Sequence, residues 1–176
     1  RRRITKAQSF LNRMGLTSAH DAGTSQLEIS ILKNMANKGD LSIRIFTMLH
    51  NNRDDYDSFL SIGPEAEDPF LKVQALKIYM DGALGSRGAA LLEPYSDDPG
   101  NVGLLRTEVP DLATLVKTFN AAGFQVNTHG IGDRAIRLVL DLYEQHADPA
   151  LRNRIEHAQN IHKDDIPRFK KLGVIP

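Results

Sequence analysis

Short apolar segments alternate with amphipathic stretches along the whole chain. The apolar or β-branched runs have the length of buried strands, and they lie at Leu16–His20, Leu41–Met48, Ala75–Tyr79, Phe124–His129, Arg154–His157 and from Val174 onward. Between them, helical patterns cover Thr24–Asn37, Pro110–Ala122, Asp133–His146 and His162–Leu172. This βαβα order predicts an α/β fold with a parallel sheet.

Local signals mark the helix boundaries. Ser25 and Glu28 have the spacing of a capping box, in which each residue satisfies a backbone N–H of the other. Gly123 and Gly173 follow two of the helical patterns, and glycine is a common residue just after a helix end. The basic residues Arg1-Arg2-Arg3 favour a helix, and we expect this helix to lie in the middle of a longer protein.

Two long connections interrupt the alternation. Asn51–Asp68 is acidic, and we expect a solvated loop that contains a short helix. Asp81–Thr107 is rich in glycine and proline. Because loops longer than about 15 residues are usually functional or disordered, this second connection is a candidate part of a site.

Polar residues at strand ends bear on the choice between a barrel and a doubly wound sheet. His20-Asp21, His50, His129 and His157 are predicted at or just beyond the carboxyl ends of four strands. In a (β/α)8 barrel these ends open on one mouth, whereas in an open sheet only those at the switch point meet. A full barrel needs about 250 residues, so this chain would hold roughly strands two to six and the start of seven of a partial TIM barrel.

Composition removes several classes of function. The chain has 176 residues, with 22 Lys+Arg against 22 Asp+Glu, so charge favours neither nucleic acid nor an anionic membrane as a partner. No apolar run reaches the roughly 18 residues of a membrane span. Without cysteine, a metal would need histidine, carboxylate or lysine-derived ligands.

Three polar residues on predicted strands are candidates for chemistry. His129 ends an apolar strand before Gly130 and Gly132, and either a structural or a metal-binding role fits it. Strand alternation places His157 on the same face as Ile155, so it is either a core histidine or a second ligand from the adjacent βα unit. Lys77 lies within an apolar strand, where it must be paired, neutral, modified or extended to water.

Four motifs together resemble the YtcJ-like branch of the metal-dependent amidohydrolases, a branch that includes N-substituted formamide deformylases. The motifs are GLTSAHDAG at 15–23, LKIYMDGALGSR at 76–87, NTHGIGDRA at 127–135 and RIEHAQ at 154–159. The resemblance covers nearly the whole chain and implies a (β/α)8 barrel hydrolase with zinc or another divalent metal at its mouth. Residues 1–176 would be the central part of one barrel domain, without the strand 1 and strand 8 regions.

The resemblance also assigns roles. His129 and His157 match the strand-five and strand-six metal ligands, and Lys77 matches the strand-four position where two-metal members place a carboxylated lysine that bridges the ions. The His-x-His pair of strand one and the aspartate of strand eight have no counterpart here, so we expect the isolated chain to be inactive. Asp81, Arg87 and Arg134 follow the ligands on loops and are candidate substrate contacts.

The expected activity is hydrolysis of a C–N bond in a small-molecule amide, formamide or cyclic amide by a metal-activated water. We expect a cytoplasmic protein with no nucleic-acid or membrane partner. With part of the barrel absent, the first and last strands expose unpaired edges, so the isolated chain should form homo-oligomers or be poorly soluble. Two alternatives remain: a non-catalytic barrel with a binding or regulatory role, and an α/β module that binds a nucleotide at Gly130-Ile131-Gly132.

Overall fold

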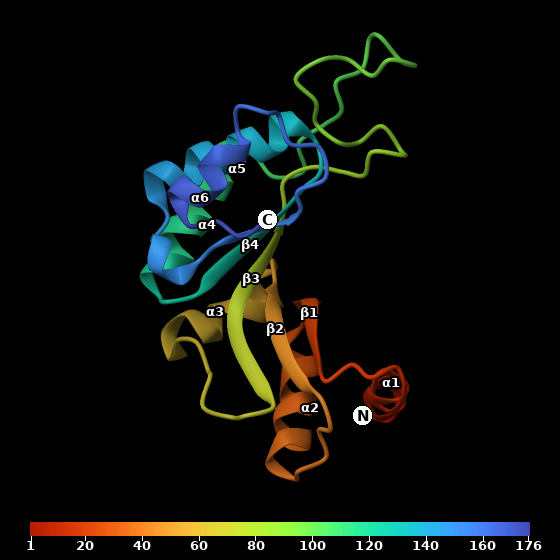
Figure 1. The fold of residues 1–176 in the computed structure, drawn as a ribbon. Helices are drawn as coiled ribbons and strands as arrows, with labels where there is room; N and C mark the ends of the chain where they lie inside the picture. Colours follow the sequence, from red (N-terminus) through yellow and green to blue (C-terminus); the bar gives the residue numbers. More distant parts are fainter. The chain divides into compact units, whose positions relative to one another are not determined.

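The computed structural model describes residues 1–176 and shows alternating strands and helices (Figure 1). In chain order the elements are α1 (Arg2–Arg13), β1 (Ser18–Thr24), α2 (Gln26–Asn37), β2 (Arg44–His50), α3 (Arg53–Ile62), β3 (Leu71–Tyr79), α4 (Val109–Ala121), β4 (Gln125–Gly130), α5 (Asp133–His146), a short 3-10 helix (Pro149–Leu151), β5 (Arg154–His157) and α6 (Ile166–Leu172). The chain divides into two compact units, Arg1–Lys77 and Ile78–Pro176, which we describe separately.

In the first unit, β1 pairs in parallel with β2, and β2 pairs in parallel with β3. Helix α2 contributes Ile29, Leu32 and Met35 to the core, all almost fully buried. Burying a side chain of this size stabilises the fold by roughly 1.5–3 kcal/mol. The capping box at Ser25 and Glu28 is present, which confirms the predicted start of this helix.

In the second unit, β4 pairs in parallel with β5, and α4 and α5 pack on each other and on β4 (Figure 1). Leu112 and Val116 of α4 and Ile136, Val139 and Leu140 of α5 are fully buried. Helix α6 packs on α5. The apolar period read along Asp133–His146 therefore marks the buried face of a real helix.

The hydrogen-bonded strand order is β1-β2-β3-β4-β5, and no strand is out of sequence order. A doubly wound sheet reverses its order at a switch point, so this topology confirms the α/β partial barrel. The run predicted from Val174 onward forms one parallel bridge beside β5, in which the Ile155 N–H donates to the Ile175 carbonyl at 2.9 Å.

Some predicted boundaries differ from the structure. The strand expected at Leu16–His20 runs instead from Ser18 to Thr24, because the Leu16 N–H still donates to the Leu11 carbonyl at the end of α1. His20 therefore lies inside β1, stacked on Phe46 with ring centroids 4.9 Å apart, and not at a strand end as predicted. The short helix expected within Asn51–Asp68 is present as α3, capped by Asn52.

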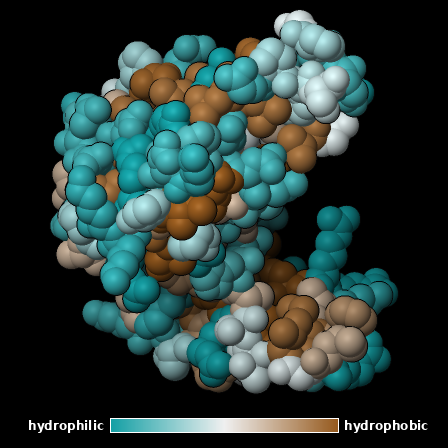
Figure 2. Space-filling view, turned by 45° about the horizontal axis from the view of Figure 1, so that its top comes forward, coloured by the Kyte–Doolittle hydropathy of each residue, from teal (hydrophilic) through white to brown (hydrophobic).

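Most of the visible surface is hydrophilic, with apolar atoms exposed in separate patches (Figure 2). The exposed apolar side chains include Phe10 of α1 and Met14, the residue that directly follows this helix. No helix is long and apolar enough to span a membrane.

Candidate metal centre

His129 reaches the carboxyl end of β4 on the face opposite the helices. Thr128 points to the helix side, where its hydroxyl lies 2.8 Å from the Tyr143 hydroxyl of α5. Because side chains alternate along a strand, Asn127 and His129 point to the other face. His129 keeps only 8% of its surface exposed. The strand therefore delivers one nearly buried imidazole to this edge of the sheet.

His157 is brought next to His129 by an unusual backbone conformation. His157 pairs in register with Gly130 and has a φ of 75°, and Ala158 has a φ of 39°. Two consecutive non-glycine residues in this left-handed region are strained, and such strain is concentrated at functional sites. The His129 and His157 ring centroids are 4.6 Å apart, with the rings at 74°.

Simple alternation predicted His157 on the face of Ile155, but the two residues differ in their surroundings. Ile155 is fully buried, whereas His157 is exposed. The positive φ turns the chain at the strand end and interrupts the alternation that holds within it. The interpretation of His157 as a buried core histidine is therefore wrong, and the ring contact with His129 fits the predicted pair of neighbouring imidazoles.

Asp81 is a fully buried carboxylate that follows β3. Its Oδ1 accepts the Ile131 N–H at 3.0 Å, and its Oδ2 accepts the Gly132 N–H at 2.8 Å and the Ala90 N–H at 2.9 Å. Its Oδ1 also lies 3.4 Å from His129 Nε2. This single side chain joins the turn after β4 to the long connection after β3.

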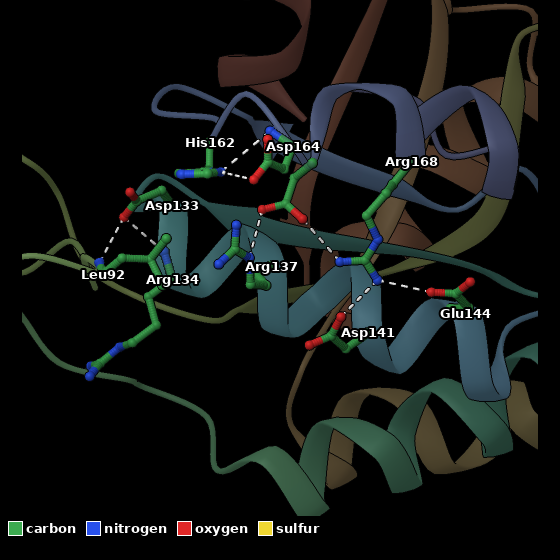
Figure 3. Close-up of polar contacts among 10 residues, drawn as sticks. Leu92, Asp133, Arg134, Arg137, Asp141, Glu144, His162, Asp164 and Arg168 are labelled. Atoms are coloured by element: carbon green, nitrogen blue, oxygen red, sulfur yellow. Dashed lines mark hydrogen bonds and ion pairs between the residues drawn. The ribbon is translucent and has the colours of Figure 1, made fainter.

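A close backbone approach completes that junction. A Cβ atom at Gly132 would lie 2.0 Å from the Ala90 carbonyl oxygen, so any larger residue there forces the backbone to move. The same carbonyl accepts the Arg134 N–H at 3.1 Å, and Asp133 Oδ1 accepts the Leu92 N–H at 2.9 Å (Figure 3). The first part of the Asp81–Thr107 connection is thus fixed against the start of α5.

The two arginines predicted to contact substrate lie in different settings. Arg87 is exposed and makes a two-pronged contact with Asp97, with Nε–Oδ1 and Nη2–Oδ2 distances of 3.2 and 2.6 Å. This hydrogen bonding raises the pKa of Arg87 and lowers the pKa of Asp97. Arg134 extends away from Asp133 in Figure 3, and its buried Nε has no hydrogen-bond partner. Substrate contact by either residue stays a prediction.

Lys77 is buried in β3, with 3% of its surface exposed, and pairs in register with His50. It belongs to the first unit, whereas both candidate histidines belong to the second. Its predicted entry into the same cavity as His129 and His157 stays a prediction. His50 ends β2 as expected, and its Nδ1 lies 3.3 Å from Asp55 Oδ2.

The donor set fits part of a divalent metal site. Imidazole nitrogens are good ligands for zinc and similar ions, and rings in edge contact at 4.6 Å allow one nitrogen of each to reach a shared ion. No group of three His, Cys, Asp or Glu side chains is arranged to hold an ion. His129 and His157 therefore supply two ligands, and a complete shell requires others.

Sequence reasoning missed two features of this centre. Asp81 was assigned to substrate, although its three backbone contacts come from residues that only the fold brings to it. The available signal was an acidic residue directly after an apolar strand and before a glycine. Asn127 was not singled out, yet it is fully buried and neither of its amide atoms has a hydrogen-bond partner.

Comparisons with known proteins agree with this geometry. Residues 1–176 match the model of a family described as the amidohydrolase family. The putative amidohydrolase YtcJ of Bacillus subtilis (strain 168) is 30% identical over 166 residues, which are 91% of this chain and 31% of that protein.

Two solved structures, both described as uncharacterized metal-dependent hydrolases, have the same fold. The protein from Pyrococcus horikoshii OT3 matches with a TM-score of 0.88 and 32% identity over 97% of this chain and 35% of its own. The protein from Pyrococcus furiosus matches with a TM-score of 0.88 and 28% identity over 97% of this chain and 36% of its own. The chain thus spans about a third of the length of these relatives.

Proposed function

Because this chain belongs to the amidohydrolase family, we propose that the protein is a metal-dependent hydrolase of C–N bonds in non-peptide amides, formamides or cyclic amides. The observation that carries this proposal is the contact between the His129 and His157 rings at the ends of consecutive parallel strands. Strand ends of this kind form the active sites of barrel enzymes.

In this proposal His129 and His157 hold a divalent metal, zinc in the first instance. When bound, zinc polarises a carbonyl group and lowers the pKa of a coordinated water to near 7. The backbone at His157 holds its ring against that of His129, and the buried Asp81 carboxylate lies behind His129. The proposal also takes Lys77, carboxylated on its amine, as a further ligand from this chain.

The substrate-binding part of the proposal assigns Arg87 and Arg134 to the amide substrate. Arg87 lies on a loop with its guanidinium held by Asp97, so a carboxylate or carbonyl group of a substrate would compete with that contact. Arg134 stands at the start of α5, close to the turn that follows His129. In this proposal both residues orient a small polar substrate for the metal site.

The test uses the whole protein with His129→Ala and His157→Ala. Each change should lower bound zinc, measured by elemental analysis, together with hydrolysis of a panel of N-substituted formamides, linear amides and cyclic amides. His162→Ala is the matched control, because His162 accepts a backbone N–H from Asp164 away from the ring pair. This variant should keep its metal and its activity.

Other outcomes would change the assignment. Loss of folding without a separate effect on zinc would return both histidines to a structural role. Zinc bound through both histidines with no hydrolysis of any C–N substrate would favour the non-catalytic binding or regulatory barrel. Binding of a nucleotide at Gly130–Gly132, with no metal, would favour the third class of function.

A further inference from the structure

We propose that Asp81 is a positioning residue that fixes the tautomer and orientation of His129, so that the Nε2–H of His129 faces Asp81 and Nδ1 is left to bind the metal. This inference rests on the proposed metal site, and it replaces the substrate contact predicted for Asp81.

Three of the acceptor positions of Asp81 are filled by the backbone. An ionised carboxylate offers roughly four lone-pair sites on two oxygens. Oδ2 accepts the N–H groups of Ala90 and Gly132, whereas Oδ1 accepts only that of Ile131. The remaining position of Oδ1 is the one that faces His129 Nε2, at 3.4 Å.

Burial makes this contact directional. Asp81 is fully buried and His129 is 8% exposed, so little water is available to compete for the ring nitrogen. A carboxylate only accepts hydrogen bonds, and the nitrogen that faces it is therefore stabilised as N–H. A metal-binding histidine generally donates its other ring N–H to a carboxylate or carbonyl, which sets the ring orientation.

The surroundings of Asp81 exclude direct contact with substrate. None of its surface is exposed, and the Gly132 backbone passes directly against Ala90 beside it. The residue is held in place by segments 9, 50 and 51 residues away in sequence. Its effect on chemistry must therefore pass through the residue it faces, which is His129.

The decisive variant is Asp81→Asn, because it keeps the outline of the side chain and changes what it offers. The remaining oxygen can still accept the N–H groups of Ala90 and Gly132. The new NH2 group replaces the acceptor of the Ile131 N–H, which costs stability, and it faces His129 as a donor, which favours the tautomer with the proton on Nδ1. In D81N the unprotonated nitrogen of the His129 ring should therefore be Nε2, whereas in the unaltered protein it should be Nδ1.

The tautomer is measured on the metal-free whole protein from the nitrogen chemical shifts of the imidazole rings, with histidine labelled by 15N. The unaltered protein should show His129 protonated on Nε2, and D81N should show it protonated on Nδ1. Zinc affinity, measured by competition with a chelator, should fall by about 10–100-fold in D81N.

Tyr95→Phe is the matched control for loosening of the same loop. The buried Tyr95 hydroxyl donates to the Ala89 carbonyl at 2.9 Å, so its loss weakens the connection without altering the acceptors that face His129. Y95F should keep the Nε2–H tautomer and the zinc affinity of the unaltered protein.

Two results would overturn the proposal. One is His129 protonated on Nδ1 in the unaltered protein, a measurement that needs no variant to fold. The other is a D81N protein of lower stability whose tautomer and zinc affinity are unchanged, since Asp81 would then only hold the loop. Zinc binding that survives His129→Ala would instead contradict the proposed metal site, while leaving the tautomer result intact.

Discussion

Buried amide side chains are fully hydrogen-bonded at the amino ends of β4 and β5, but not further along β4. At the amino ends, Asn120 and Asn153 form a closed pair, in which each amide donates to the other at 3.0 Å. Asn153 Oδ1 also accepts the Val126 N–H at 2.7 Å, and Asn120 Oδ1 accepts the Asp148 N–H at 2.8 Å. Both the oxygen and the NH2 group of each amide are therefore hydrogen-bonded.

Further along β4, at the position that pairs with Arg154 of β5, the same residue type is left without hydrogen bonds. Asn127 is as fully buried as any core residue, and both of its amide atoms lack a partner. Nearby, His157 and Ala158 hold positive φ angles that non-glycine residues rarely adopt. An unsatisfied buried polar group costs about 1–3 kcal/mol, and each strained residue costs a similar amount.

The difference separates stability from function within one pair of strands. In barrels, features at the amino ends of strands generally serve stability and those at the carboxyl ends serve chemistry. The amide pair holds the start of both strands together, so that positions further along the strands can carry strained and unsatisfied groups. Removing a satisfied contact should therefore lower the free energy of unfolding, whereas removing the unsatisfied amide of Asn127 should raise it.

The largest effect is expected for Asn153→Leu at the amino ends. The change leaves the Val126 N–H without its acceptor and removes both hydrogen bonds with the Asn120 amide, so the free energy of unfolding should fall by about 3 kcal/mol. Urea denaturation measures it. Gln125→Ala is the control on the same end of β4, because Gln125 donates to carbonyls at the exposed edge, and it should cost no more than about 1 kcal/mol. Equal losses in the two variants would contradict the special role of the amide pair.

Gly132→Ala at the carboxyl ends comes next. The added Cβ would meet the Ala90 carbonyl oxygen at 2.0 Å, and forced backbone movement should lower the free energy of unfolding by about 2 kcal/mol. Gly85→Ala, where nothing lies within 4 Å of the added atom, should stay within about 0.5 kcal/mol. Thermal unfolding of both variants makes the comparison, and a tolerated Gly132→Ala would show that the loop and the turn are not tightly joined.

Tyr143 contacts the middle of these strands, and its ionisation should make the free energy of unfolding depend on pH in the alkaline range. Burial raises the pKa of its hydroxyl well above the usual value of 10.0. Above pH 10 the unfolded chain loses this proton and the folded chain keeps it, so stability falls as pH rises, by about 1.4 kcal/mol per pH unit.

The measurement is urea unfolding between pH 9 and 11 with Tyr143→Phe beside the unaltered chain. The variant loses the hydroxyl whose single proton is shared between the Val126 and Arg154 carbonyls, and it is less stable throughout. Above pH 10, the free energy of unfolding of the variant should nevertheless fall less steeply with pH, by the contribution of one proton, which is about 1.4 kcal/mol per pH unit. Parallel slopes would show that Tyr143 ionises equally in both states.

The smallest effect, and the one of opposite sign, is expected for Asn127→Val. Valine suits a strand and removes the two unsatisfied amide atoms, so the free energy of unfolding should rise by about 1 kcal/mol. Thr128→Val, one residue along on the helix face, breaks the contact with Tyr143 and should lower stability by a similar amount. A loss of stability in Asn127→Val would remove the contrast between Asn127 and the Asn120–Asn153 pair.

Much of the fold was accessible from the sequence because its signals are local. The capping box at Ser25 and Glu28 and the apolar period of α5 depend on residues within one or two helical turns. The order of parallel strands followed from the βαβα pattern. Boundaries were less accurate, as the late start of β1 shows, since the end of α1 extends its hydrogen bonding to Leu16.

The site was only partly accessible, and for a physical reason. The adjacency of His129 and His157 follows from their places on consecutive strands, but the positive φ at His157 has no glycine to mark it. The three N–H groups around Asp81 come from residues remote in sequence. The partner of Arg87, Asp97, lies within the same loop and carries no periodic signal.

The long connection after β3 also has a practical consequence for engineering. Its near part is joined to the start of α5, as the contacts of Ala90 and Leu92 show. Its tip closes on itself, because the Tyr95 N–H donates to the Asn101 carbonyl and the Leu91 N–H to the Val102 carbonyl, both at 2.9 Å. Residues 93–101 thus form a cassette, and we expect grafts from relatives to be accepted there, whereas a graft that crosses residues 81–92 would displace His129.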